Sequence, residues 1–307
     1  MTVTLADMIN EVQMNLSGYT LQQDRNTYLK TPITTTTSSS AAPLIVSLGS
    51  TESVGKGVIE IDSELLWVDS YDRISNTATI APFGRGYLGT TPATHELDTK
   101  VTISPTFPRF SIRRAIDDTV KGISASLYAV KTTTFVYNAA VTTYGFNNLN
   151  IKNILNMSWQ SIGPSKEWIP IRNWDLDHTA NATVFGANAQ TVSIGDSIIS
   201  GRTVKVTYAT DGVPFTSDSQ DYATQTGFPE STKDIIVLGA AYRLLSYLDP
   251  ARSGSTSPQA DEIDSKRPAG STNAAVKQLY ALYQQRLQQE VASQQTNFPT
   301  RVHYSRR

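Results

Sequence analysis

The sequence predicts an α+β protein in which a discontinuous four-helix bundle carries two inserted antiparallel β modules, a small barrel or meander and a β-sandwich. Two observations predict this class. Apolar residues recur at helical spacing in four separated stretches of the chain. Short apolar or alternating runs, bounded by turn residues, occupy the segments between them. The length of 307 residues allows one large domain or two ordinary ones, each with its own core.

The first helix is expected within residues 1–30. Its apolar stripe consists of Leu5, Met8, Ile9, Val12 and Leu16. Thr4 stands at the N-cap position, and the carboxylate of Asp7 suits the positive end of the helix dipole. Gly18 is expected to end the helix. A helix this short is not stable alone, so its stripe must pack on other elements.

The first β module is expected over residues 31–107. Its opening stretch, 31–43, is poor in large apolar groups and is predicted to be a loop. The expected strands are Val58–Ile61, Leu65–Val68, Thr77–Ile80 and Val101–Ile103. Asp62-Ser63-Glu64 separates the first two at hairpin-like spacing. Short strands at close intervals predict a small barrel or a curled meander.

The second helix is expected over residues 108–132, introduced by Pro108 and capped by Ser111. One face carries Ile112, Ile116, Val120, Ile123 and Leu127. The opposite face carries Arg113, Arg114, Asp117, Asp118 and Lys121. A face with charges of both signs is typical of a solvated helix or of a contact with a neighbouring subunit, rather than of a catalytic site.

The second β module is expected over residues 133–215. Val204, Val206 and Tyr208 alternate with polar residues, which is the period of a half-buried strand. Further expected strands are Ile154–Trp159, Trp168–Ile171 and Val192–Ile194. Together these runs predict an antiparallel sandwich inserted between helices.

Two C-terminal helices are expected within residues 216–295. The first begins near Ser231, where Asp234 makes a variant of the capping box. Its stripe consists of Ile235, Leu238, Ala241, Leu244, Leu245 and Leu248. The second begins near Ser271, and its stripe consists of Val276, Leu279, Tyr280, Tyr283, Leu287 and Val291. The segment 249–270 between them is rich in Pro, Ser and Gly and is expected to be a long loop.

Composition excludes several classes of protein. The formal net charge of -1 argues against a dedicated nucleic-acid binder, which usually shows a basic excess on one face. The absence of cysteine excludes disulfides, thiolate metal sites and cysteine nucleophiles. No window approaches the roughly eighteen apolar residues that a membrane-spanning helix needs, and the N-terminus lacks the pattern of a targeting segment. We therefore expect a soluble protein without membrane contact.

The sequence offers no catalytic residue, cofactor site or metal site. No G-x-S-x-G nucleophile elbow occurs. The histidines, His95, His178 and His303, are too widely spaced to hold a metal on one helix face. Asp175 and Asp177 beside His178 could in principle bind a cation, but such a stretch in a β module is more often a turn. We therefore expect a protein that is not an enzyme.

Two further patterns have structural interpretations. Residues 50–57 resemble a Walker A loop, but Ser50 replaces its first glycine and Gly57 replaces the residue that binds magnesium. A strand is also expected to follow, where a phosphate-binding loop must open a helix. The tryptophans that could serve as sugar platforms are Trp159, Trp168 and Trp174. In a module this small, tryptophan more often belongs to a core or a subunit interface.

Residues 84–95 resemble a known sequence element, the R-G-x-x-G-T-x-x-x-x-H stretch found in many phage virion proteins. The residues that match it are Arg85, Gly86, Gly89, Thr90 and His95. The glycines permit a tight reversal of the chain. Arg85 and His95 are then placed to form hydrogen bonds across the loop and to lock it. We interpret these residues as a structural loop rather than as a ligand site.

The wider layout is similar to that of the head–tail adaptors, or neck connectors, of long-tailed bacteriophages. An N-terminal helix, a β module and the Pro105–Arg109 entry to a second helix occur in the same order. A late helix containing Gly239–Leu245 and a last helix ending in Arg286–Glu290 also match. The resemblance covers most of the chain as an order of elements, and the sandwich at 133–211 is its least matched part.

This resemblance implies a structural virion protein that is made in the host cytoplasm and resides in the neck. It implies a dodecameric homo-oligomeric ring that docks on the portal protein and on the next neck or tail protein. The ring would line part of the channel through which DNA leaves. The near-neutral charge suits a conduit that passes DNA transiently and without specificity. Long amphipathic helices with mixed-charge outer faces suit a ring of packed subunits.

The C-terminal tail, residues 296–307, contains arginines and no acidic residue. We expect it to insert into a neighbouring ring, with the portal as the first candidate, and to order as it binds. The predicted partner-binding residues are Phe298, Arg301, Val302, His303, Tyr304, Arg306 and Arg307. The alternative is a frayed terminus. The apolar side chains of Phe298, Val302 and Tyr304 favour insertion, because a merely disordered tail would lack such anchors.

Two other functions stay open. Another tail or baseplate protein could use the sandwich for contact, and a sixfold or threefold ring in the particle would favour it over a twelvefold one. A carbohydrate-binding protein built on the two β modules is the third possibility. In that case residues 133–211 would bind glycans and lose them when Trp168 or Trp174 is changed.

Overall fold

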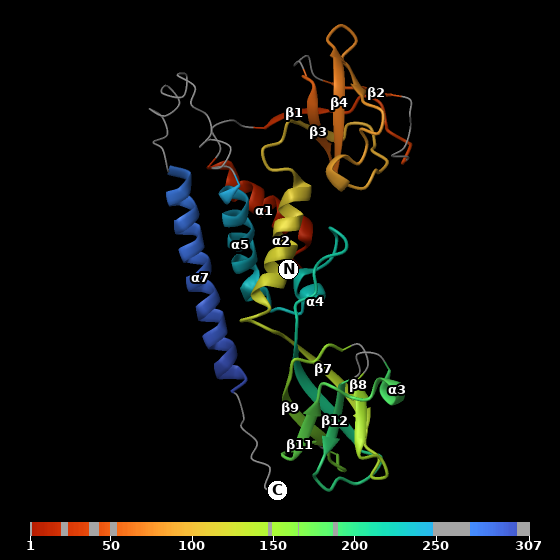
Figure 1. The fold of residues 1–307 in the computed structure, drawn as a ribbon, viewed down its shortest axis with the longest axis vertical. Coiled ribbons are helices and arrows are strands. Elements are labelled where there is room, and N and C mark those ends of the chain that lie inside the picture. The colour runs from red at the N-terminus through yellow and green to blue at the C-terminus, as the bar shows by residue number, and fades with distance from the viewer. Residues whose placement is uncertain are drawn as a thin grey trace. The chain divides into compact units, whose positions relative to one another are not determined.

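The computed structural model describes residues 2–19, 24–36, 43–49, 54–146, 149–164, 166–186, 190–247 and 271–299. The chain divides into two compact units. The barrel unit comprises Ala6–Ile116 and Val237–Tyr280. The sandwich unit comprises Met1–Leu5, Asp117–Ile236 and Ala281–Arg307. Both contain helices and antiparallel sheet, which confirms the α+β class (Figure 1). The expected loop 249–270 lies outside the described residues.

The barrel unit contains a six-stranded antiparallel sheet in the order β1-β6-β3-β4-β5-β2. Its strands are β1 (Arg25–Tyr28), β2 (Leu44–Ser47), β3 (Gly57–Ile61), β4 (Glu64–Asp72), β5 (Thr77–Ile80) and β6 (Lys100–Ile103). The outermost strands meet, because the Lys30 N–H donates to the Ser47 carbonyl at 2.9 Å and the Gly49 N–H donates to the Tyr28 carbonyl at 2.8 Å. An isolated bridge between Leu29 and Leu48 completes the junction. The sheet thus closes into a small barrel.

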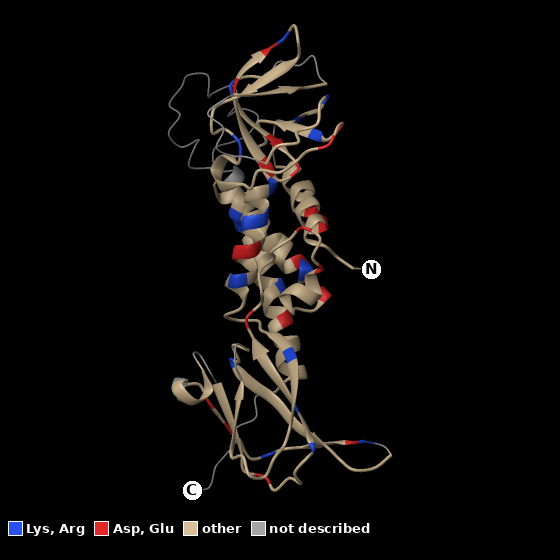
Figure 2. Ribbon diagram, turned by 90° about the vertical axis from the view of Figure 1, so that its right-hand side faces the viewer, with Lys and Arg blue, Asp and Glu red and all other residues tan. Residues whose placement is uncertain are grey.

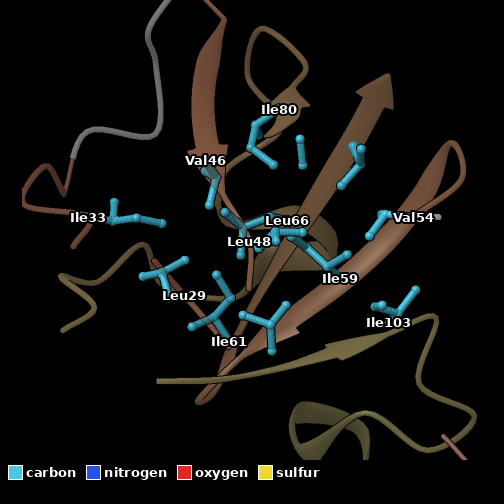
Figure 3. Packing of buried hydrophobic residues seen from close by; sticks show 13 residues of the cluster. Leu29, Ile33, Val46, Leu48, Val54, Ile59, Ile61, Leu66, Ile80 and Ile103 are labelled. Atoms are coloured by element: carbon cyan, nitrogen blue, oxygen red, sulfur yellow. The ribbon is translucent and has the colours of Figure 1, made fainter. Parts of the chain in front are cut away.

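The barrel is filled by aliphatic side chains that converge from most of its strands (Figure 3). The buried cluster consists of Leu29, Ile33, Val46, Leu48, Val54, Ile59, Ile61, Leu66, Val68, Ala78, Ile80, Val101 and Ile103. In β3 the side chains of Ile59 and Ile61 enter this cluster, as the two-residue period of a strand requires. Glu60 between them therefore points away from the barrel interior, yet only 3% of it is exposed.

One strand of the barrel, β1, lies within the segment that was expected to contain only the first helix. Its sequence, Arg25–Tyr28, shows no alternation of apolar and polar residues. The strand forms because it pairs with β6, where Arg25 lies opposite Ile103 and Tyr28 opposite Lys100. That partner is distant in sequence, so local pattern gives no signal for the strand.

The first helix, α1, spans Leu5–Ser17 and follows Thr4 directly, as its stripe predicts. Every residue of the predicted stripe is at most 1% exposed. No described helix combines the length and apolar character that crossing a membrane requires.

The second helix, α2, spans Arg109–Ile123. The expected cap at Ser111 is wrong, because Ser111 lies inside the helix. Instead, the buried carboxyl group of Glu60, on β3, accepts a hydrogen bond from the Arg109 N–H at 2.6 Å. This bond satisfies one of the backbone N–H groups in the first turn of α2 that have no partner within the helix. The predicted apolar stripe is buried. Arg114, Asp118 and Lys121 are exposed, and Figure 2 shows residues of both signs interspersed along the helices.

The sandwich unit contains two antiparallel sheets, ordered β10-β9-β13-β7 and β11-β12-β8. Their strands are β7 (Ala129–Val136), β8 (Thr143–Phe146), β9 (Asn153–Gln160), β10 (Trp168–Pro170), β11 (Trp174–Asp177), β12 (Gln190–Ile194) and β13 (Thr203–Thr210). One core joins the sheets, with Met157, Val204 and Val206 from the first and Phe146 and Val192 from the second. This arrangement is the sandwich that the alternation in β13 predicts.

The remaining helices are α3 (Ala182–Phe185), α4 (Tyr222–Thr226), α5 (Lys233–Ser246) and α7 (Ser271–Asn297). The short helix α4 was not expected, and it is capped by Asp221, whose side chain accepts the Thr224 N–H. A 3-10 turn at Glu230–Thr232 precedes α5. The boundaries between the two units fall inside α1, α2, α5 and α7, so a single four-helix bundle stays a prediction.

Candidate functional site

The loop of residues 84–95 is organised around a carboxylate that the sequence pattern did not indicate. Glu64 begins β4, and its side chain is fully buried. The guanidinium of Arg85 donates two hydrogen bonds to this carboxylate, from Nε to Oε1 at 2.6 Å and from Nη2 to Oε2 at 2.8 Å. Arg85 also donates to the carbonyls of Thr35 at 2.8 Å and Ala93 at 2.6 Å. Bidentate pairs of this kind fix geometry as well as charge.

His95 approaches the same carboxylate from the other end of the loop. Its Nε2 lies 2.8 Å from Oε2 of Glu64, and its Nδ1 lies 2.8 Å from Oδ2 of Asp62. The main chain of His95 also exchanges two hydrogen bonds with Ile33, each 2.8 Å long. A protonated imidazole donates from both nitrogens, so it satisfies both carboxylates at once.

Backbone groups of the loop complete the network. The N–H groups of Gly86 and Ala93 donate to Glu64 at 3.1 and 3.0 Å. Thr90 accepts the Leu65 N–H on its hydroxyl at 3.0 Å. Gly86 has a φ of 64°, and a Cβ there would lie 2.7 Å from the Thr90 carbonyl oxygen, so only glycine fits. We call Glu64, Arg85 and His95, with these backbone donors, the carboxylate staple.

The staple shifts the pKa values of its members in opposite directions. Burial by itself raises the pKa of Glu64, but the hydrogen bonds from Arg85, His95 and Ala93 outweigh it and lower that pKa to about 2. Burial by itself lowers the pKa of His95, but its hydrogen bonds to Glu64 and Asp62 outweigh it and raise that pKa above the usual value. Glu64 is therefore ionised at neutral pH, and its hydrogen bond favours the protonated form of His95. This arrangement ties the loop to β4.

Sequence analysis missed Glu64 because it read Asp62-Ser63-Glu64 as a turn between strands. A signal was present in the loop itself. A guanidinium and an imidazole that both point inward need a buried acceptor, because buried charges are paired in folded proteins. Glu64, at the start of β4, is the residue that supplies it.

The acidic stretch in the sandwich engages its neighbours rather than converging on one point. Asp177 accepts hydrogen bonds from the N–H of Thr179 at 2.8 Å and from its hydroxyl at 2.9 Å. The Nδ1 of His178 lies 3.0 Å from the side-chain nitrogen of Gln190. In the part of the chain that the structure describes, no group of three or more His, Cys, Asp or Glu residues could hold a metal ion.

The three tryptophans of the sandwich lie in different surroundings. Trp159 and Trp174 are partly buried and pack against the sandwich core. Trp168, on β10, is 40% exposed. The ammonium of Lys205 lies 4.5 Å from the centroid of its ring, in a cation–π contact. One face of the exposed ring is therefore already occupied.

Helix α7 has an unusual exposed face. It is 27 residues long, and its buried contacts are made by Leu279, Tyr283 and Leu287. A second row, on which every residue is exposed, repeats at alternating steps of four and three: Ala274, Gln278, Ala281, Gln285, Gln288, Ala292 and Gln295. This row, the Ala/Gln stripe, contains no charged residue. Exposed helix faces of globular proteins normally carry charges.

The described chain ends close to two hollows in the sandwich unit. Phe298 lines a groove of about 420 Å³, together with Tyr128, Phe228 and Glu290. It also lines a hollow of about 190 Å³ beside Lys152. The other predicted partner-binding residues, Arg301, Val302, His303, Tyr304, Arg306 and Arg307, lie outside the described residues.

Comparison with known proteins adds no relative. No protein-family model matches the chain, and no curated protein matches its sequence.

Proposed function

We propose that this chain is a structural subunit of a tailed-bacteriophage particle, an adaptor in the neck between head and tail. Copies of it form a ring that docks on the portal and on the next neck or tail protein, and the ring lines part of the DNA channel. The loop at 84–95 and the order of elements suggest this class of protein. The observation that carries the proposal is the exposed, uncharged Ala/Gln stripe of α7.

The Ala/Gln stripe suits contact with another helix better than contact with water. Steps of four and three residues keep a stripe facing one partner along a whole helix. Alanine lets backbones approach closely, and glutamine can form hydrogen bonds across an interface without the desolvation cost of a charge. Cores of protein interfaces are depleted in charged residues in the same way. A ring places such a stripe between neighbouring subunits.

The carboxylate staple supports the same reading. It makes the 84–95 loop rigid and satisfies its charged groups internally, which suits a part that maintains its shape under mechanical load. The net charge of -1 suits a channel through which DNA slides.

Adding charge to the Ala/Gln stripe is expected to abolish ring formation while the subunit still folds. In Gln285→Glu/Gln288→Glu, like charges would face the neighbouring copy without partners, so joining of heads to tails should fall at least tenfold. The free energy of unfolding should change by less than about 0.5 kcal/mol, because both residues are exposed. Complementation of defective particles measures the first quantity, and urea unfolding measures the second.

The matched control is Gln285→Met/Gln288→Met, which keeps the size of the side chains and adds no charge. It should join heads to tails as well as the unchanged protein does. Normal joining by the glutamate variant would show that the stripe is not an interface.

Deletion of residues 299–307 is expected to give subunits that fold normally but do not join portal-bearing heads. The reason is that the tail supplies basic and apolar groups to the adjoining ring. Sedimentation of mixtures with purified heads measures the joining, and the full chain is the control. Joining at the normal level by the shortened chain would refute insertion of the tail.

An averaged image of the particle tests the proposed function as a whole. A twelvefold ring of this protein between head and tail is the expected result. A sixfold or threefold ring elsewhere would assign the chain to the tail or baseplate instead. Glycan binding that disappears in Trp168→Ala would favour a carbohydrate-binding protein.

A further inference from the structure

Strand β7 forms one edge of the four-stranded sheet, and its outward main-chain groups can be identified from the register. The Tyr137 N–H donates to the Arg202 carbonyl at 2.7 Å, so odd-numbered residues of this strand face β13. Because successive residues of a strand alternate, the even-numbered residues face away from the sheet. They are Val130, Thr132, Thr134 and Val136. Among the described residues, nothing is paired with them at this edge.

Tyr128 directly precedes β7, and its main-chain N–H and C=O both form hydrogen bonds with a side-chain amide. The side-chain amide of Gln294 accepts the Tyr128 N–H at 3.3 Å and donates to the Tyr128 carbonyl at 2.7 Å. A carboxamide that makes both bonds reproduces the pairing of one peptide group of a neighbouring strand. The edge therefore has the geometry to accept a peptide, and the groove of about 420 Å³ that Val130 lines lies at the next position.

The edge of β7 lacks the protection that other edges in this chain have. β1 and β2 are joined to each other, and β10 spans three residues and ends at Pro170. The edge strands of the other sheet, β8 and β11, span only four residues each. β7 spans eight residues, contains no proline, and pairs with β13 without a break in register. Long, regular edge strands are templates for pairing with another chain unless they are covered or interrupted.

We propose that the edge of β7 accepts an extended, acidic segment of another protein as an added strand. The charge of the surface selects this partner. The strand that would border it, β7, carries Lys131 and no acidic residue. Main-chain hydrogen bonds to the four outward residues supply affinity, and a carboxylate placed beside Lys131 supplies selectivity. The proposal concerns a different surface from the Ala/Gln stripe and does not depend on where the protein resides.

Amide hydrogen exchange of the full chain tests the proposal with a defined probe. The probe is a blocked octapeptide that alternates threonine or valine with glutamate, and the comparison peptide has lysine in place of glutamate. In the free protein the outward amides of Thr132 and Thr134 should exchange fast, while that of Thr133 is protected. With the acidic peptide at twice its dissociation constant, exchange of the outward amides should slow about threefold. The lysine peptide should have no effect.

Two proline variants check that the edge is the binding site. Thr132→Pro removes an outward N–H and should abolish the effect of the acidic peptide while the sandwich stays folded. Thr133→Pro removes an N–H that pairs with β13 and should unfold the sandwich.

The other outcomes each overturn the proposal. Outward amides that are already protected in the dilute free protein would mean that this chain covers its own edge. Protection that grows with protein concentration alone would identify a second copy as the occupant. An equal effect of both peptides would remove the acidic selectivity, and no effect of either would remove the site.

Discussion

Replacement of Glu64 by glutamine is expected to lower the free energy of unfolding of the barrel by about 3–5 kcal/mol. The carboxylate balances the guanidinium of Arg85, whose side chain is 5% exposed, and the imidazole of His95, whose side chain is 1% exposed. Without it, the buried guanidinium loses its carboxylate partner and Nε2 of His95 loses the group that it bonds. Urea unfolding followed by circular dichroism measures the loss.

The exposed ion pair of the same barrel provides the control. Lys56 and Asp69 are 2.7 Å apart, and their side chains are 65% and 52% exposed. Asp69→Asn should cost less than about 1 kcal/mol, because solvent screens such pairs. If Glu64→Gln cost no more than Asp69→Asn, the staple would have no energetic role.

The pH dependence of the staple provides a second readout of the same variant. The pKa of Glu64 is lowered to about 2 in the folded state, so its stabilisation is present above the ordinary glutamate pKa of 4.5 and is lost as the pH falls toward 2. Glu64→Gln should lack this acid-dependent part of the stability. His95 acts in the opposite range, because its raised pKa gives stability that is lost as the pH rises above its usual value.

The sequence predicted those features that depend on near neighbours in the chain. The stripes of α1 and α2 are buried as their spacing requires, and the alternation in β13 places Val204 and Val206 in a core. These patterns come from the geometry of one element, so they can be read without knowing its partners.

The features that were missed depend on partners distant in sequence. β1 has no pattern of its own and forms by pairing with β6. The N-terminus of α2 is satisfied by Glu60 from the barrel, which no capping rule applied to Ser111 could reveal. Glu64 and Arg85 lie 21 positions apart, and only the closed barrel brings them together. The sequence thus predicted the loop residues of the site, whereas the central carboxylate of Glu64 could be identified only from the folded structure.

Glu60 gives the second large prediction, a loss of stability as the pH rises toward neutrality and beyond. Glu60 is 3% exposed, and its carboxyl accepts a hydrogen bond from the Arg109 N–H at 2.6 Å. Burial raises its pKa to about 7, although the hydrogen bond and charge of Arg109 and the charge of Lys100 oppose this, and Asp24 adds to it. Deprotonation thus places a poorly solvated charge between the barrel and the first turn of α2.

The sign follows from the direction of the pKa shift. A carboxyl whose pKa is raised on folding binds its proton more tightly in the folded state. Folding is therefore most favourable below the ordinary glutamate pKa of 4.5 and weakens as the pH rises through about 7. The full loss is about 3 kcal/mol, at roughly 1.4 kcal/mol for each pKa unit. Glu60→Gln keeps an oxygen that accepts the Arg109 N–H and removes the titration. It should therefore be more stable than the unchanged protein at pH 8 and nearly equal to it at pH 5.

The difference between the two stability curves isolates Glu60, because His95 titrates in both proteins and cancels. Urea unfolding between pH 5 and pH 8.5 measures both curves, and Glu96→Gln, at an exposed position of the same barrel, is the matched control. The control curve should run parallel to that of the unchanged protein. If the Glu60→Gln curve also ran parallel to it, the carboxyl would be ionised without cost, and the barrel would have to solvate the carboxylate through groups other than Arg109.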